Sequence, residues 1–150
     1  MANEFTIELT QLEDYRFEVR FDRAGVPALI TDEDAPLGRD AGPSPARLLA
    51  AAVANCLAAS LLFAMRKFKN EPSPLRAVAR VTEGRNEQKR LRITGIAVDL
   101  HLGLPAAEIN MLERIIGQFE DFCTVTASIR AALPVTVRVF DSTGAALGTG

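Results

Sequence analysis

The 150-residue sequence has few of the side chains that bind metals or cross-link small folds: one histidine, two cysteines and no tryptophan. The single histidine, His101, disfavours a metal site, and we expect neither a metal nor a cofactor. The two cysteines, Cys56 and Cys123, lie 67 positions apart, so they form neither a CxxC redox motif nor a zinc knuckle. The glycines form no GxGxxG or Walker pattern, so nothing indicates nucleotide binding.

An excess of charge of one sign is also lacking, because 17 basic and 19 acidic residues leave a net charge of −2. This balance gives no general attraction to nucleic acid or to an anionic membrane, and we expect neither as a partner. Basic residues do cluster over 85–92. No aromatic residues interleave with them, which favours a solvated turn over a base-stacking surface.

A secretory signal is not indicated either. The first ten residues, MANEFTIELT, lack the basic start and the apolar run that such a signal needs. The longest apolar run, Leu48 to Met65, is rich in alanine and interrupted by polar residues, which is typical of a buried helix rather than a membrane span. We therefore expect a cytoplasmic protein, in which thiols are kept reduced and two cysteines are either inert or transiently redox-active.

Hydrophobic periodicity predicts a single α+β domain over residues 1–150. Alternating apolar residues predict antiparallel strands at the N-terminus, and Ser44 followed by Pro45 predicts the start of a long central helix. The predicted elements are strands within 5–9 and 15–21, a short strand over 28–31, a helix over about 46–68, a hairpin of strands over 76–83 and 90–102, helices starting at Pro105 and near Cys123, and a final strand over 135–140. Residues 141–150 are expected to form a frayed tail.

The two cysteines are the main candidates for chemistry. Cys56 falls in the middle of the long helix, on its apolar stripe, where no neighbour in sequence activates it. Cys123 falls in the first turn of a short helix, and a helix N-terminus favours a thiolate, although Glu120 and Asp121 oppose its ionisation. Local sequence therefore marks Cys123 as the more activated thiol. Either cysteine could instead be a small buried packing residue, and that alternative stays open.

Two segments, GPSPARLLAAAVANC and FCTVTASIRAALPV, resemble the OsmC/Ohr family of thiol peroxidases, named for osmotically inducible protein C and the organic hydroperoxide resistance protein. The predicted order of elements matches that family as well, so the resemblance covers most of the chain. It implies an OsmC-like fold, an intertwined homodimer with the active site at the subunit interface, and antioxidant reduction of organic hydroperoxides. Cys56 would be the peroxidatic thiol and Cys123 the resolving thiol, with a small or protein dithiol as reductant.

The resemblance also implies an arginine, supplied by the loop before the long helix, that stabilises the peroxidatic thiolate. Arg39 lies in the corresponding loop and is the candidate, although an ordinary solvated arginine is an equal alternative. An apolar wall around Cys56 would suit an organic peroxide better than hydrogen peroxide. Leu49, Val53 and Phe63 are the candidate substrate-binding residues for such a wall.

One position departs from the family pattern. The glutamate that usually pairs with the arginine falls at Ala46, and Asp40 or Glu33 in the preceding loop are its possible substitutes. This loss leaves catalysis uncertain and opens a second hypothesis, a non-catalytic OsmC-like protein that binds an apolar small molecule at the dimer interface.

Overall fold

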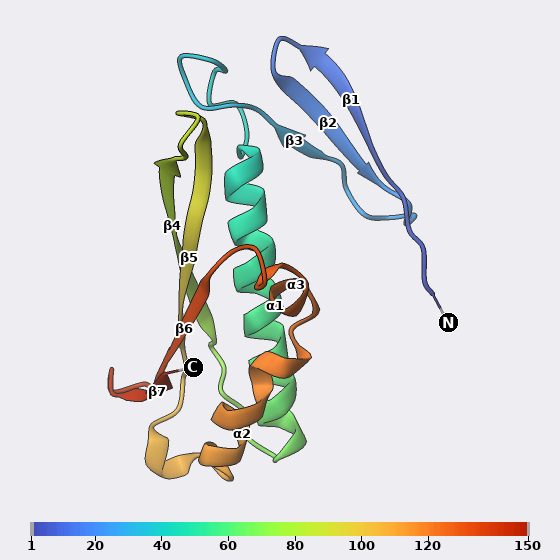
Figure 1. Cartoon of the computed structure of the whole chain (residues 1–150). Coiled ribbons are helices and arrows are strands. Elements are labelled where there is room, and N and C mark those ends of the chain that lie inside the picture. The colour runs from blue at the N-terminus through green and yellow to red at the C-terminus, as the bar shows by residue number, and fades with distance from the viewer. Residues whose placement is uncertain (1, 150) are drawn as a thin grey trace. The chain divides into compact units, whose positions relative to one another are not determined.

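The computed structural model describes residues 2–149, and the chain divides into two compact units, residues 1–49 and 50–150. The N-terminal unit holds a three-stranded sheet of order β1-β2-β3, and the C-terminal unit holds a four-stranded sheet of order β4-β5-β6-β7. Helix α1 (Pro45–Lys67) begins in the first unit and continues through the second (Figure 1). Antiparallel strands, a long helix, a hairpin, short helices and the strand β6 follow in the α+β order that the sequence predicts, and a further strand, β7, comes after them.

The N-terminal unit is an antiparallel meander of β1 (Ile7–Glu13), β2 (Arg16–Phe21) and β3 (Leu29–Thr31). Ile7 pairs with Phe21 and Leu9 pairs with Val19, so the alternating apolar residues share one face of the sheet. The predicted period of two is therefore confirmed.

Helix α1 matches its predicted bounds to within one residue at each end. Ser44 caps it, because its Oγ accepts a hydrogen bond from the backbone N–H of Arg47 at 3.4 Å. By length and composition α1 could cross a bilayer. It is instead the core helix of this fold, and its buried residues are Ala50, Val53, Ala54, Leu57, Ser60, Leu61, Ala64 and Met65.

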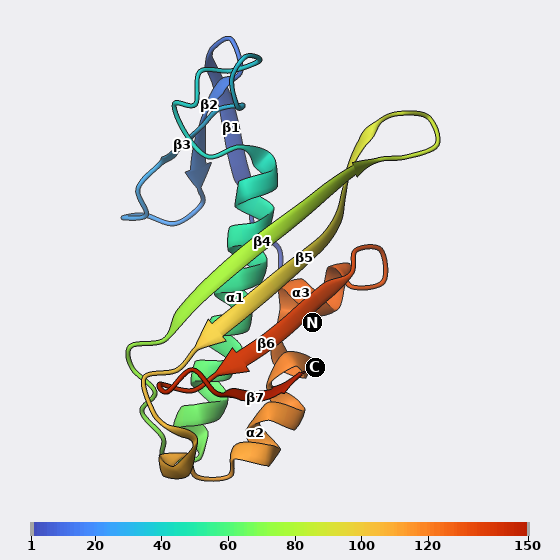
Figure 2. The same cartoon turned by 90° about the vertical axis from the view of Figure 1, so that its left-hand side faces the viewer.

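The C-terminal sheet pairs β4 (Arg76–Arg85) antiparallel with β5 (Leu91–His101), and β5 parallel with β6 (Val135–Phe140). A parallel pair needs a crossover connection. Here the crossover carries η1 (Ala106–Glu108), α2 (Leu112–Gln118), η2 (Phe119–Phe122) and α3 (Thr124–Ile129). Helices α2 and α3 lie on the same face of the sheet as α1 (Figure 2).

The opposite face of this sheet carries a buried carboxylate. Asp99 on β5 accepts hydrogen bonds from Arg80 on β4 at 2.8 Å and from both Nε and Nη2 of Arg138 on β6 at 2.8 Å. The two guanidinium groups, Arg138 first, hold the pKa of Asp99 well below its usual range. The Asp99 side chain therefore links β4, β5 and β6 on the face of the sheet away from the helices.

The prediction of a frayed tail is wrong for residues 141–149. A turn after Asp141 leads into β7 (Ala146–Thr149), which pairs antiparallel with β6. Its four residues, ALGT, give no strand signal of their own, so tertiary contacts decide its structure. Gly150, the last residue of the expected tail, lies outside the described residues.

Asp141 anchors this turn, because its carboxylate accepts hydrogen bonds from the hydroxyl of Thr143 and from the backbone N–H groups of Thr143, Ala145 and Ala106 at 2.6–3.0 Å. The Thr143 hydroxyl foremost, together with those N–H groups, lowers the pKa of Asp141 from 3.8 to about 2. The carboxylate therefore stabilises the fold above its unfolded pKa, and this contribution is lost as pH falls toward about 2.

We expect the Asp141→Asn variant to show a smaller loss of unfolding free energy than the wild type between about pH 4 and pH 2. Urea denaturation across that range, monitored by circular dichroism, measures the difference. Parallel curves for the two proteins would contradict the role given to Asp141.

Candidate active site

Cys56 lies on α1 at the boundary between its buried and exposed sides. Val53 and Ser60, one turn away on either side, are buried, whereas Ala52 and Ala59 are exposed. Cys56 itself is half-buried. Cys56 is therefore partly exposed, as reactive cysteines usually are, while its neighbours one turn away belong to the core.

Cys123 lies at the junction of η2 and α3, where it is the N-cap residue of α3. Its side chain is completely buried, and its thiol donates a hydrogen bond to the Oγ1 of Thr126 at 3.1 Å. Burial raises the pKa of the Cys123 thiol. The expectation that Cys123 is the more activated thiol is therefore wrong, because local sequence does not reveal the surrounding core.

Two contacts hold the segment that carries Cys123. The ring of Phe119 is buried in the core, and Arg130 at the end of α3 donates to the carboxylate of Glu120 at 2.7 Å. From its position in the sequence, Glu120 is expected to oppose ionisation of Cys123. In the structure its charge is paired with Arg130 instead.

The fold brings the two cysteines together. The Cys56 thiol lies close enough to Cys123 to contribute, after burial, to the raised pKa of the Cys123 thiol. Both sulfurs are free, not bonded to each other. Two neighbouring thiols of unequal exposure can form a disulfide once the more accessible one is oxidised. Within residues 2–149 there is no cluster of three or more metal-ligating side chains.

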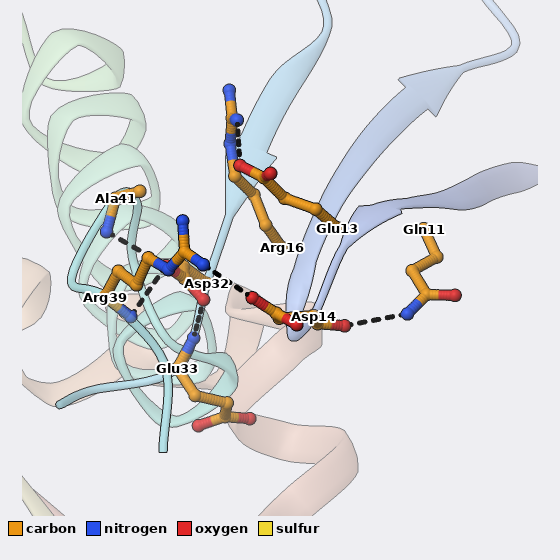
Figure 3. A network of polar contacts seen from close by, with 8 residues as sticks. All are labelled: Gln11, Glu13, Asp14, Arg16, Asp32, Glu33, Arg39 and Ala41. Carbon is orange, nitrogen blue, oxygen red and sulfur yellow. Dashed lines mark hydrogen bonds and ion pairs between the residues drawn. The ribbon is translucent and has the colours of Figure 1, made fainter. Parts of the chain in front are cut away.

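Arg39 belongs to the N-terminal unit, in the loop between β3 and α1. Its Nη2 donates to the carboxylate of Asp14, in the β1–β2 turn, at 2.9 Å (Figure 3). Neither Asp40 nor Glu33, the substitutes considered from sequence, makes this ion pair. Asp14 was missed because it lies 25 positions away from Arg39 in the chain.

Asp32 fixes the backbone of the Arg39 loop. Its side chain is buried and accepts hydrogen bonds from the backbone N–H groups of Glu33, Arg39 and Ala41 at 2.8–3.1 Å (Figure 3). Burial opposes ionisation, but these three donors outweigh it and lower the pKa of Asp32. Gly38 completes the loop, since a Cβ there would come within 2.6 Å of the Asp32 carboxylate. The loop is therefore built around one carboxylate.

The remaining predicted site residues differ in exposure. Val53 is completely buried, Leu49 is half-buried, and Phe63 is 66% exposed. Ala46 occupies the first turn of α1, which contains no acidic residue. The first turn of α1 thus supplies no carboxylate, and Phe63 lies apart from the buried side of α1.

The fold is thus α+β, with a half-buried thiol in the middle of α1 and a fully buried thiol beside it. The family model described as OsmC-like protein matches residues 38–138 of this chain. That match spans more than half of the sequence, so the chain belongs to the OsmC-like protein family. No curated protein sequence matches the chain.

Solved structures share the fold at low sequence identity. An OsmC-like protein of unknown function from Vibrio cholerae aligns with a TM-score of 0.77 and 15% identity, over 93% of this chain and 100% of that one. An organic hydroperoxide resistance protein from Elizabethkingia anophelis aligns with a TM-score of 0.71 and 20% identity, over 95% and 100%. The organic hydroperoxide resistance protein OhrB of Bacillus subtilis aligns with a TM-score of 0.66 and 19% identity, over 90% and 98%.

Proposed function

We propose that the protein is a cysteine-based peroxidase that reduces organic hydroperoxides in the cytoplasm. The observation that supports this function is the pairing of Cys56 with Cys123, two thiols 67 positions apart in sequence that lie next to each other in the fold. Membership of the OsmC-like family and the fold shared with organic hydroperoxide resistance proteins support the same class of substrate.

The reaction begins at Cys56, the more exposed sulfur. Its thiolate attacks the distal oxygen of the hydroperoxide, the O–O bond breaks, and the alkoxide takes up a proton to leave as an alcohol. The Cys123 sulfur then attacks the Cys56 sulfenic acid, forming a disulfide and releasing water. A dithiol reductant restores both thiols by exchange.

Arg39 is the proposed cation for the Cys56 thiolate, with Asp14 in the pairing role of the family glutamate that Ala46 replaces. A guanidinium has five N–H donors, so one donor to Asp14 leaves others for an anionic sulfur or a peroxide oxygen. Leu49 and Phe63 are proposed to contribute apolar surface to the substrate site, while Val53 supports Cys56 from within the core.

We also propose a homodimer, because apolar surface on both units is left uncovered in a single chain. On α1 the side that carries Ala52, Ala59 and Phe63 is exposed, and a helix that is apolar all round is normally buried. On β1 the apolar residues Ile7 and Leu9 are exposed as well. A second copy that covers these surfaces would explain both.

We expect the protein to elute with a mass about twice 16.2 kDa in size-exclusion chromatography with light scattering. Phe63→Glu should shift it toward the monomer, because a charge cannot be buried without a partner. Met111→Glu, at another exposed apolar residue, is the matched control and should leave the dimer intact. A stable wild-type monomer would contradict the shared interface.

Thiol oxidation tests the enzymatic proposal directly. The reduced protein is treated with one equivalent of cumene hydroperoxide or hydrogen peroxide, and the Cys56–Cys123 disulfide is followed by mass spectrometry. We expect rapid disulfide formation that is faster with the organic oxidant. If both thiols stay reduced over minutes with either oxidant, the peroxidase proposal is wrong and binding of an apolar molecule becomes the better explanation.

A further inference from the structure

The thiol proposed to resolve the reaction lies in an environment that disfavours its reactive form. Thiol–disulfide chemistry proceeds through the thiolate. Cys123 is completely buried, and burial raises its pKa. An efficient second step therefore needs a group that offsets the cost of charge on this sulfur.

Thr126 is the side chain that meets this need. It lies three residues after Cys123 in α3, is itself completely buried, and its Oγ1 is 3.1 Å from the Cys123 sulfur. Thr126 is also the residue that lowers the pKa of Cys123 against the effects of burial and of Cys56. A hydroxyl both accepts and donates hydrogen bonds, so it can accept from the thiol and then donate to the thiolate.

We propose that Thr126 is a positioning residue for the resolving step, which holds the Cys123 sulfur and donates a hydrogen bond to its thiolate as that sulfur attacks Cys56. This inference rests on the proposed function. In the step, an S–S bond forms and the S–O bond of the Cys56 sulfenic acid breaks. The departing hydroxide combines with the proton that Cys123 released, so water leaves, Cys123 is oxidised and Cys56 is reduced to the disulfide level.

A purely structural role makes the opposite prediction. A buried hydroxyl costs free energy unless it is hydrogen-bonded, and valine fills nearly the same volume without one. If Thr126 served only to fill the core, Thr126→Val would fold well and leave the chemistry of Cys123 unchanged. If Thr126 assists the thiolate, the same variant would fold well but form the disulfide slowly.

A probe that contains no peroxide isolates this step. The neutral disulfide 2,2′-dithiodipyridine reacts first with the more exposed Cys56 and releases one pyridinethione. Cys123 then attacks the mixed disulfide and releases a second, so the two absorbance phases report the two cysteines separately. Wild type, Thr126→Val, Thr126→Ser and Thr124→Val are compared across pH. Thr124 is exposed on the same helix and is the matched control.

We expect Thr126→Val to slow the second phase about tenfold and to move its pH midpoint upward by about one pH unit, since a hydrogen bond to a charged group is lost. The first phase should not change. Thr126→Ser, which keeps the hydroxyl, should resemble wild type, as should Thr124→Val. A second phase in Thr126→Val as fast as in wild type at every pH would overturn the proposal.

The probe also separates this inference from the proposed function. If the wild-type protein forms the Cys56–Cys123 disulfide with the probe but not with hydroperoxides, the peroxidase proposal is wrong. The Thr126 assignment would then still be supported by the variants. A wild-type protein that releases no second pyridinethione would overturn the Thr126 assignment, whatever its behaviour with peroxides. Circular dichroism of each variant verifies that the compared proteins are folded.

Discussion

Replacing Cys56 with serine is expected to abolish the consumption of cumene hydroperoxide. A serine hydroxyl at neutral pH is far less nucleophilic than a thiolate, and no sulfenic acid can form without the Cys56 sulfur. Cys123 cannot take over, because it is completely buried and burial raises its pKa. The expected loss is therefore complete, and a coupled assay with a dithiol reductant measures it.

Cys123→Ser is the matched variant for this test, since it removes the other sulfur and leaves Cys56 in place. It should consume one equivalent of hydroperoxide and stop, with a sulfenic acid trapped on Cys56 that a dimedone adduct reveals by mass spectrometry. Full multiple-turnover activity in Cys56→Ser would show that the nucleophile has been wrongly assigned.

The second large effect is expected from Arg39→Gln, which should slow the reaction of Cys56 with hydroperoxide by at least about tenfold. A cation aimed at the developing charge is worth this much or more when the site is preorganised. The single-turnover rate of Cys56 oxidation, in the Cys123→Ser background, is the quantity to measure.

Two further variants make the Arg39 test specific. Arg20→Gln removes an exposed arginine of the same unit, paired with Glu18 at 2.6 Å, and should leave the rate unchanged. Asp14→Asn should have a smaller effect than Arg39→Gln, because the Arg39–Asp14 pair is exposed and therefore weak, while Asp32 continues to hold the loop backbone. If Cys56 is oxidised at the same rate in Arg39→Gln as in Arg20→Gln, the role proposed for Arg39 is wrong.

The sequence predicts most of the elements because their signals are local. Alternation in β1 and β2 and the Ser44–Pro45 start of α1 depend on neighbours a few residues away, and each agrees with the structure. The two cysteines could also be singled out from sequence, and the structure places them side by side.

Other features depend on contacts that a sequence does not display. The buried side of α1 is not marked by periodicity, because nearly all its residues are apolar, and so Phe63 was grouped with Val53 although it is exposed. The partner of Arg39 comes from a distant turn at Asp14. The state of Cys123 is decided by a core assembled from several segments.

Because Cys123 lies on the crossover between β5 and β6, the proposed redox cycle would change the stability of the fold. Cys123 lies on this crossover and Cys56 on the helix before β4, so a bond between them would close a loop of 67 positions that contains the whole β4–β5 hairpin. Closing a loop of that length lowers the entropy of the unfolded chain by an amount worth about 4 kcal/mol at 25 °C. The oxidised protein would then resist unfolding more than the reduced one, and each reduction by a dithiol would return the chain to its less stable form.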